Sequence, residues 1–376
     1  MRLSGKWRGK LGATMFLAVV ITIAFTTYTS AGRRSGVGCE RTLSVDPHQH
    51  TTSWHKDSQV TPAHPATRDT EYAHEPLESG FATVQITKVK DVEFADDPEA
   101  FFMSILAVNG SLFAAYRTTL SSWETKVIKM DASFAPSANE QGRRIPNTED
   151  ARVIEFQGEG WLIDNHFLQP RAMTSLDGRY HVVLKTTELG NDFERGKNWA
   201  PFVYQSRLFF VYSLSPLRVL ECTMPEGTLR WVHGVSRGSG NPKGLGDMLK
   251  RGGTNGIVHD NHVYGIGRET MYENIVCSGA QHANVAQHYP FLWRFHVSLL
   301  DSAVPFNETS ARSDDIEIRK IEHPFNHGVN DPASLFVHDS ALYLTVSSCA
   351  CACLPEFRTS NAWQRNSVYR VQLKER

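Results

Sequence analysis

Short apolar runs separated by turns recur five times along this chain, and no long helical period appears between residues 81 and 373. Each copy has a polar lead, a short run of β-branched and aromatic residues, a turn of two to four residues and a second such run, which is typical of a β-hairpin. The copies occupy residues 104–116, 151–163, 201–212, 256–266 and 333–345.

The spacing of these hairpins predicts one architecture. The first four begin roughly 50 residues apart, the length of a four-stranded propeller blade. Further β runs, at residues 125–130, 180–186, 218–222, 291–297 and 368–373, are expected to form the outer strands. A β-sandwich is the alternative, but the polar lead repeats together with the hairpin. We therefore expect an all-β, five-bladed β-propeller over residues 79–376, which begins with an alternating strand near Phe81.

The first 78 residues have a different pattern. Basic residues in the first ten precede an uncharged stretch at residues 11–32, which is long enough to cross a bilayer as a single transmembrane helix. The basic flank predicts a cytoplasmic tail at residues 1–10 and a type II signal-anchor, with the rest of the chain facing the Golgi or endoplasmic reticulum lumen. A cleaved signal peptide and a secreted protein are the alternative. Residues 33–78, rich in Thr, Ser, Pro and His, are predicted to be a disordered stem.

Other features fit the secretory pathway. Asn109 and Asn307 begin Asn-x-Ser/Thr acceptor sequences for N-glycosylation. The chain holds 6 Cys, and an even number in an oxidising compartment predicts disulfide bonds of unspecified connectivity. The run Cys-x-Cys-x-Cys at residues 349–353 has no second ligand cluster at zinc spacing, so no metal site is predicted. The formal net charge of -1 gives no support for a nucleic-acid partner.

The innermost strand of each propeller blade starts beside the central channel, so the five polar leads should converge there. The leads supply Asp96, Asp97 and Glu99, then Glu149, Asp150 and Arg152, then Lys197, Asn198 and Trp199, then Arg251 and Thr254, and finally His327, Asn330 and Asp331. Carboxylates and cations thus alternate around one predicted channel. Such a set suits a polyhydroxylated substrate and acid/base chemistry at a glycosidic oxygen.

The lead Glu149-Asp150-Ala151-Arg152 resembles the Glu-Asp-Pro-Arg lead of glycoside hydrolase family 130, with Ala in place of Pro. Segments 197–202, 212–220 and 251–254 resemble related secretory-pathway β-mannosyltransferase-like proteins, and the resemblance covers residues 94–371 in blade order. It implies a five-bladed propeller and an inverting reaction on β-mannosides, with Asp150 as the proton donor. It also implies that Arg152, Lys197 and Arg251 bind phosphate or substrate hydroxyls.

Cleavage and transfer both remain open from the sequence. Asp150 is the candidate catalytic residue, as an acid in glycoside cleavage or as a base on an acceptor hydroxyl in transfer, and the predicted membrane anchor favours glycan synthesis. The candidate substrate-binding residues are Asp97, Glu149, Arg152, Lys197, Asn198, Trp199, Arg251, Thr254, His327 and Asp331. No cofactor is predicted, and the candidate co-substrate is inorganic phosphate or a sugar nucleotide.

Other functions are alternatives to a carbohydrate-active enzyme. A glycan or oligosaccharide is the expected partner, and the alternatives to an enzyme are a non-catalytic glycan-binding propeller and a scaffold for protein–protein assembly. The chain has no Gly-x-Ser-x-Gly elbow, no His-Glu-x-x-His pair and no phosphate-binding Gly-Lys-Ser/Thr loop. It also lacks an Asp-x-Asp run, which argues against an ordinary metal-dependent glycosyltransferase.

Overall fold

The computed structural model describes residues 83–119, 123–137, 141–164, 171–185, 198–234, 250–277, 279–301, 315–321, 328–350 and 364–374. The chain divides into two units, residues 1–75 and 76–376, and all of the described residues belong to the second. The predicted tail, membrane segment and stem lie outside the described residues, as do Lys197, Asn307 and His327. In the part of the chain that is described, no helix has the length and apolar character required to span a membrane.

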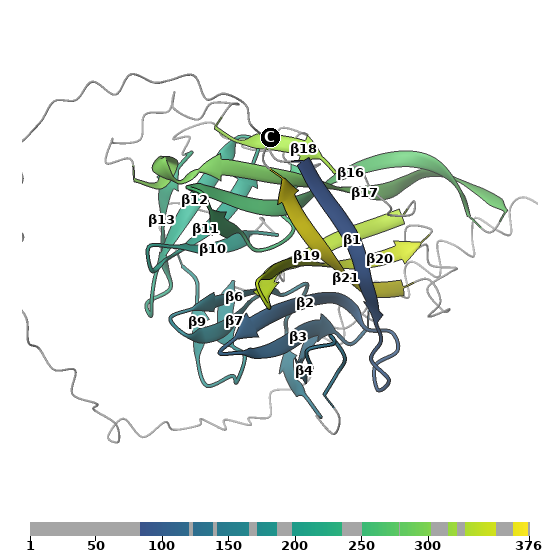
Figure 1. Ribbon diagram of the computed structural model, residues 1–376, viewed down its shortest axis with the longest axis horizontal. Helices are drawn as coiled ribbons and strands as arrows, with labels where there is room; N and C mark the ends of the chain where they lie inside the picture. The colour runs from purple at the N-terminus through teal and green to yellow at the C-terminus, as the bar shows by residue number, and fades with distance from the viewer. Residues whose placement is uncertain are drawn as a thin grey trace, which may run out of the picture. The chain divides into compact units, whose positions relative to one another are not determined.

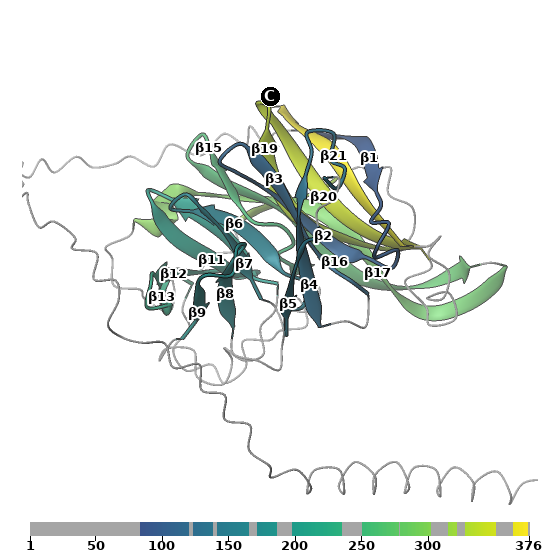
Figure 2. The same cartoon turned by 90° about the horizontal axis from the view of Figure 1, so that it is seen from below.

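Five antiparallel sheets make up the described fold, and they are numbered here as blades in chain order (Figures 1 and 2). The first blade consists of β2 (Phe101–Val108), β3 (Ser111–Arg117), β4 (Glu124–Met130) and β5 (Arg143–Pro146). The second consists of β6 (Arg152–Phe156), β7 (Glu159–Ile163), β8 (Ala172–Ser175) and β9 (His181–Val183). The third consists of β10 (Ala200–Tyr204), β11 (Arg207–Leu214), β12 (Leu217–Thr223) and β13 (Thr228–His233).

The last two blades depart from this simple order. The fourth contains β14 (Lys250–Arg251), β15 (Ile257–His259), β16 (His262–Cys277), β17 (Ala280–His296) and β18 (Glu317–Lys320), and the 3-10 helix η2 (Val297–Leu300) follows β17. The fifth contains β19 (Gly328–His338), β20 (Ala341–Ala350) and β21 (Gln364–Lys374), and it is completed by β1 (Thr83–Val92) from the start of the fold. The predicted five-bladed propeller is therefore confirmed.

The strand near Phe81 has a role that the sequence did not indicate. β1 pairs antiparallel with β21, from Thr83 opposite Lys374 to Val92 opposite Asn366, and is the outermost strand of the fifth blade. The predicted outer strand at residues 368–373 is thus a third strand. The same correction applies to residues 125–130, 218–222 and 291–297, because β5, β13 and β18 lie outside them.

All five inner hairpins use the same two-residue turn. The turns are Asn109-Gly110, Gln157-Gly158, Gln205-Ser206, Asp260-Asn261 and Asp339-Ser340, and each of these residues has a positive φ. Two consecutive left-handed residues define the type I′ turn, whose twist matches that of the flanking strands. In the first turn the exposed Asn109 also donates its side-chain amide to the carbonyl of Gly158 at 3.2 Å. Its predicted glycosylation stays a prediction.

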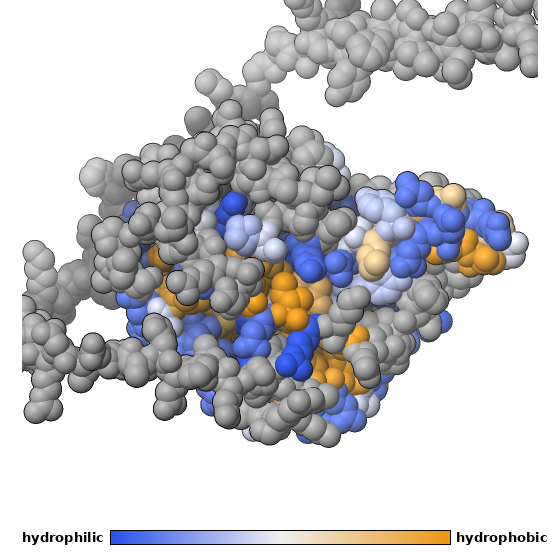
Figure 3. Space-filling model, turned by 90° about the horizontal axis from the view of Figure 1, so that it is seen from above, coloured by the Kyte–Doolittle hydropathy of each residue, from blue (hydrophilic) through white to orange (hydrophobic). Residues whose placement is uncertain are grey.

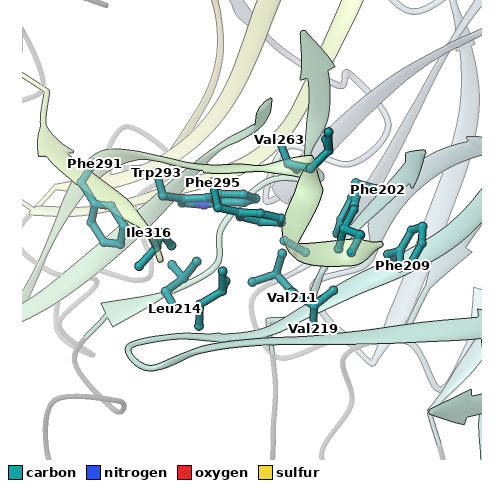
Figure 4. Close-up of a cluster of buried hydrophobic side chains, with 14 residues drawn as sticks. Phe202, Phe209, Val211, Leu214, Val219, Val263, Phe291, Trp293, Phe295 and Ile316 are labelled. Atoms are coloured by element: carbon teal, nitrogen blue, oxygen red, sulfur yellow. The ribbon is translucent and has the colours of Figure 1, made fainter. Parts of the chain in front are cut away.

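Apolar clusters between neighbouring blades form the core. Between the third and fourth blades, Phe202 stacks on Phe209 and meets Phe295 edge-on, and Trp293 stacks on Phe295 (Figure 4). The other neighbouring pairs of blades share equivalent clusters, which contain Val127 with Val153, Ile163 with Phe210, Ile266 with Leu335, and Ile105 with Phe336. Because the fifth blade also packs on the first, the sheets close into a ring. A two-layer sandwich would not produce this closure.

Polar contacts join the inner strands around the same ring. Ser104 donates to the carbonyls of Ala151 and Ala333, so the first blade is linked to the second and the fifth. The third and fourth blades meet where the amide of Gly256 donates to the carbonyl of Pro201 at 2.8 Å. The fourth and fifth blades meet where the side chain of Asn255 hydrogen-bonds both backbone groups of Leu335. Arg152 closes the remaining gap through Asn198. The polar leads therefore precede inner strands that are hydrogen-bonded to one another.

Three cysteines fall within the described residues. Cys222 has a free, buried thiol, and burial raises its pKa to about 12. Cys277 and Cys349 are disulfide-bonded. The sequence predicted disulfide bonds without specifying their connectivity.

Candidate active site

Asp150 lies directly before β6, the inner strand of the second blade. Its carboxylate Oδ1 accepts a hydrogen bond from Nη1 of Arg117 at 3.0 Å, and the same Nη1 lies 3.7 Å from Oε1 of Glu149. The φ of Asp150 is +48°, a strained backbone conformation for a residue with a Cβ. The surrounding contacts thus hold one carboxylate in a fixed direction, beside a second carboxylate and a shared cation.

Arg152 is a deeply buried cation, with 1% of its surface exposed. Its guanidinium donates to the carbonyl of Asp150 at 3.2 Å and to Oδ1 of Asn198 at 3.3 Å, and it lies over the ring of Phe102 at 4.4 Å. Its Nε is buried with no hydrogen-bond partner within the described ranges. Burial lowers the pKa of Arg152 to about 10, while the charge of Asp150 opposes that shift, so the side chain stays cationic at neutral pH. A buried charge with an unused donor indicates a polar or anionic ligand.

Two more arginines meet on the fourth blade. Arg251 on β14 lies directly opposite Arg268 on β16 in the strand register, and like charges in that position repel. Burial lowers the pKa of Arg268 to about 9. The charge of Asp150 raises that pKa, and those of Arg251 and Arg152 lower it further. The charges of Arg152, Arg251 and Asp150 all act on Arg268, and an anion bound near Arg268 and Arg251 would relieve the repulsion between those two guanidinium groups.

His288 and Asp331 complete this group. Oδ1 of Asp331 pairs with Nη1 of Arg268 and lies 2.6 Å from Nδ1 of His288, which is itself 2.7 Å from Arg268. Burial and the charges of Arg268 and Arg251 lower the pKa of His288 to about 2. The imidazole is therefore neutral at physiological pH and orients the Arg268–Asp331 pair without adding charge.

Several predicted residues thus come together. Glu149, Asp150, Arg152, Asn198, Arg251 and Asp331 all belong to this set, which we call the channel cluster together with Arg117, Arg268 and His288. Among the described residues no group of three or more His, Cys, Asp or Glu side chains is arranged to hold a metal ion.

Asp97 is not brought to the channel cluster. Its carboxylate accepts hydrogen bonds from Tyr116 at 2.8 Å and Lys126 at 2.7 Å. Burial alone would raise the pKa of Asp97, but these two hydrogen bonds outweigh burial and hold it below its usual range. Tyr116 and Arg117 are consecutive on β3 and point to opposite faces of the sheet, so Asp97 and Asp150 bind to opposite faces of the first blade.

The side chains of Trp199 and Thr254 are buried and make contacts within the fold. The Trp199 ring has no exposed surface and packs against Phe210, with the Arg171 guanidinium 4.4 Å from its centre. The Thr254 hydroxyl donates to the carbonyl of Asn255 at 2.7 Å and accepts from the amide of Ile266 at 3.0 Å. The Trp199 ring packs against an aromatic ring and a guanidinium, and the Thr254 hydroxyl already donates and accepts a hydrogen bond, so the proposed site is built without them.

Sequence reasoning missed Phe102, Arg117, Arg268 and His288. Arg117 ends β3, and Arg268 lies on β16 just past the apolar run at residues 263–266. The second strand of a hairpin returns to the end where the first strand begins, so a charged residue after the second apolar run is a usable signal. His288 lies in the middle of β17, where no local pattern marks it.

Comparison with known proteins gives one partial sequence match. No protein-family profile matches the chain. β-Mannosyltransferase 3 of Candida albicans is 40% identical to it over 117 residues, which are 31% of this chain and 20% of that protein. The match thus spans a fifth of the relative's length. The chain resembles a β-mannosyltransferase over that part, in agreement with the mannose-active proteins that its motifs resemble.

Solved structures of similar outline cover most of the chain. A GDP-Man-dependent mannosyltransferase from Leishmania mexicana is 8% identical and covers 78% of this chain and 90% of its own, with a TM-score of 0.47. A mannose phosphorylase from the same organism is 9% identical over 75% and 88%, with a TM-score of 0.41. An α-L-arabinofuranosidase from Lactobacillus brevis is 9% identical over 73% and 90%, with a TM-score of 0.43. At such values these likenesses carry no argument about activity.

Proposed function

We propose that this protein is an inverting enzyme that transfers a mannosyl group between a phosphate ester and a hydroxyl of a β-mannoside. The observation that carries the proposal is the cross-strand pair of Arg251 and Arg268, with the charges of Arg152 and Asp150 near enough to act on Arg268. Arg152 and Arg268 are buried, Arg251 is half-buried, and Arg268 is also paired with Asp331. Guanidinium groups in such a cluster suit a phosphate or diphosphate, which they bind through charge-assisted hydrogen bonds. The partial identity to a β-mannosyltransferase supports mannose as the transferred sugar.

The reaction follows from these assignments. In synthesis, an acceptor hydroxyl attacks the anomeric carbon from the side opposite the phosphate, the bond from that carbon to the phosphate oxygen breaks, and the configuration inverts. Asp150, held as a carboxylate by Arg117, accepts the proton of the attacking hydroxyl. The phosphate leaves with the bonding electron pair, and the arginines stabilise its charge. In the reverse direction, protonated Asp150 gives its proton to the glycosidic oxygen.

The type II topology and the lumenal location remain part of this proposal. A luminal enzyme that extends glycans would meet its acceptors in the secretory pathway, and the basic flank followed by residues 11–32 supports such an orientation. A non-catalytic glycan-binding propeller is the competing function, and the experiment below separates the two.

The test uses the full-length protein with mannose 1-phosphate or a nucleoside-diphosphate mannose as donor and β-mannobiose as acceptor. Products are identified by mass spectrometry, and the new anomeric configuration by NMR. Asp150→Asn should lower kcat by about 100-fold or more, with donor binding retained, because the base is lost and the shape is kept. Asp260→Asn, in an exposed turn, is the matched control and should keep full turnover.

Two results would overturn the proposal. One is wild-type protein that binds a mannoside but turns over neither donor, which would identify a glycan-binding propeller. The other is an Asp150→Asn variant with the wild-type rate, which would exclude Asp150 as the base.

A further inference from the structure

One hairpin of the fourth blade is much longer than its counterparts. β16 and β17 have 16 and 17 residues, whereas β3 and β4 of the first blade have 7 each. The extra length projects from the propeller as an arm (Figures 1 and 2). Arg268 and His288 of the channel cluster lie at the root of this arm, so the arm starts at the proposed site.

The strand register shows which residues share a face of the arm. Side chains alternate along a strand, so Arg268, Thr270 and Tyr272 point to the same side of β16. Thr270 is directly opposite His288 on β17, and no irregularity interrupts the register between Arg268 and Tyr272. These four residues, Arg268, Thr270, Tyr272 and His288, therefore form one continuous face, which we call the arm face.

Tyr272 is the exposed end of the arm face. It is 61% exposed, which leaves its ring accessible to a ligand. Four residues of strand separate it from Arg268, or about 13 Å. A short oligosaccharide spans such a distance, whereas a single sugar does not.

Contacts on the other face tie the two strands of the arm to each other. The hydroxyl of Tyr289 hydrogen-bonds both carboxylate oxygens of Glu273 at 2.9 Å, and Asn274 accepts from the backbone amide of Asn284. Near the tip, Cys277 is disulfide-bonded. The space-filling view shows apolar and polar surface side by side on this arm (Figure 3). The arm face is thus a preorganised surface, which lowers the ordering cost of binding.

We propose that the arm face is a subsite for the distal sugars of an oligosaccharide acceptor, with the ring of Tyr272 stacked on a sugar residue. Tyrosine suits this role because its apolar ring covers the C–H face of a sugar while its hydroxyl stays in water. The inference rests on the proposed function, since it extends the acceptor away from the phosphate held by the arginines. With this subsite the enzyme elongates oligosaccharide chains and prefers longer acceptors.

The test compares β-mannobiose and β-mannopentaose as acceptors for the full-length protein with the same donor. Tyr272→Ala should raise KM for the pentasaccharide about 3- to 10-fold, with kcat unchanged, and should leave both constants for the disaccharide as they are. Tyr272→Phe should retain the wild-type KM, because stacking needs the ring and not the hydroxyl. Met271→Ala is the matched control, since Met271 is the next residue, 42% exposed and on the opposite face.

Distinct outcomes separate this inference from the proposed function. If wild-type protein uses both acceptors and Tyr272→Ala affects neither, or affects both equally, the subsite is refuted and the transfer activity stands. An equal effect of Met271→Ala would also refute it, because the arm would then act through its fold alone. If wild-type protein uses neither acceptor, the proposed function and the subsite fail together.

Discussion

The histidine held between Arg268 and Asp331 should make the stability of the propeller depend on pH in a defined range. Burial and the charges of Arg268 and Arg251 lower the pKa of His288 from 6.5 to about 2 in the folded protein. In the unfolded chain the side chain is solvated, and its pKa returns to about 6.5. As the pH falls below that value, the unfolded state takes up a proton that the folded state does not. Acid therefore favours unfolding, and the loss continues down to the folded pKa.

The size of the effect follows from the two pKa values. Well below the unfolded pKa, each pH unit changes the free energy of unfolding by about 1.4 kcal/mol for one proton. Between about pH 7 and pH 5, His288 alone should lower the free energy of unfolding by about 2 kcal/mol. His288→Asn keeps an acceptor near Arg268 but cannot titrate. The pH dependence of this variant should therefore be weaker than that of wild type by the same amount.

The assay is urea unfolding across this pH range, followed by tryptophan fluorescence and fitted to a free energy at each pH. His181→Asn, at an exposed position on β9, is the matched control and should keep the wild-type pH dependence. Parallel curves for wild type and His288→Asn would refute the reasoning, because His288 would then bind protons equally in both states.

Two further predictions concern the scaffold, and urea unfolding measures both. Ser206→Gly should raise the free energy of unfolding by about 0.5–1 kcal/mol, because Ser206 has a φ of +59° that strains any residue with a Cβ. A variant with a lower free energy of unfolding than wild type would contradict the type I′ turn. Gly265→Ala should lower it by about 2–3 kcal/mol, because the added methyl would overlap the buried indole of Trp293 in the core between two blades. An unchanged urea midpoint for Gly265→Ala would show that this core is looser than the structure indicates.

Much of the fold could be predicted from local patterns. Alternation of apolar and polar residues and two-residue turns are properties of short segments, so all five inner hairpins were found. The structure extends the fourth to Cys277 and the fifth over Gly328 to Ala350. The role of β1 was not found, because pairing Thr83 with Lys374 is a choice among distant strands that no local pattern encodes. Four predicted outer strands, β4, β12, β17 and β21, are third strands, because the strand that lies outside each of them is chosen by the same kind of pairing.

The same distinction between local pattern and distant pairing applies to the residues of the candidate site. The sequence by itself determined which blades carry chemically capable leads, and Asp150, Arg152, Arg251 and Asp331 follow from the position of a lead before an inner strand. Only the tertiary structure decided which side chains face one another. Antiparallel pairing returns the ends of second and third strands to the leads, which adds the arginine of β16 and the histidine of β17. Trp199 is fully buried against Phe210 and Arg171, a packing that its place in a lead did not indicate, because contacts between blades are set only when the sheets assemble.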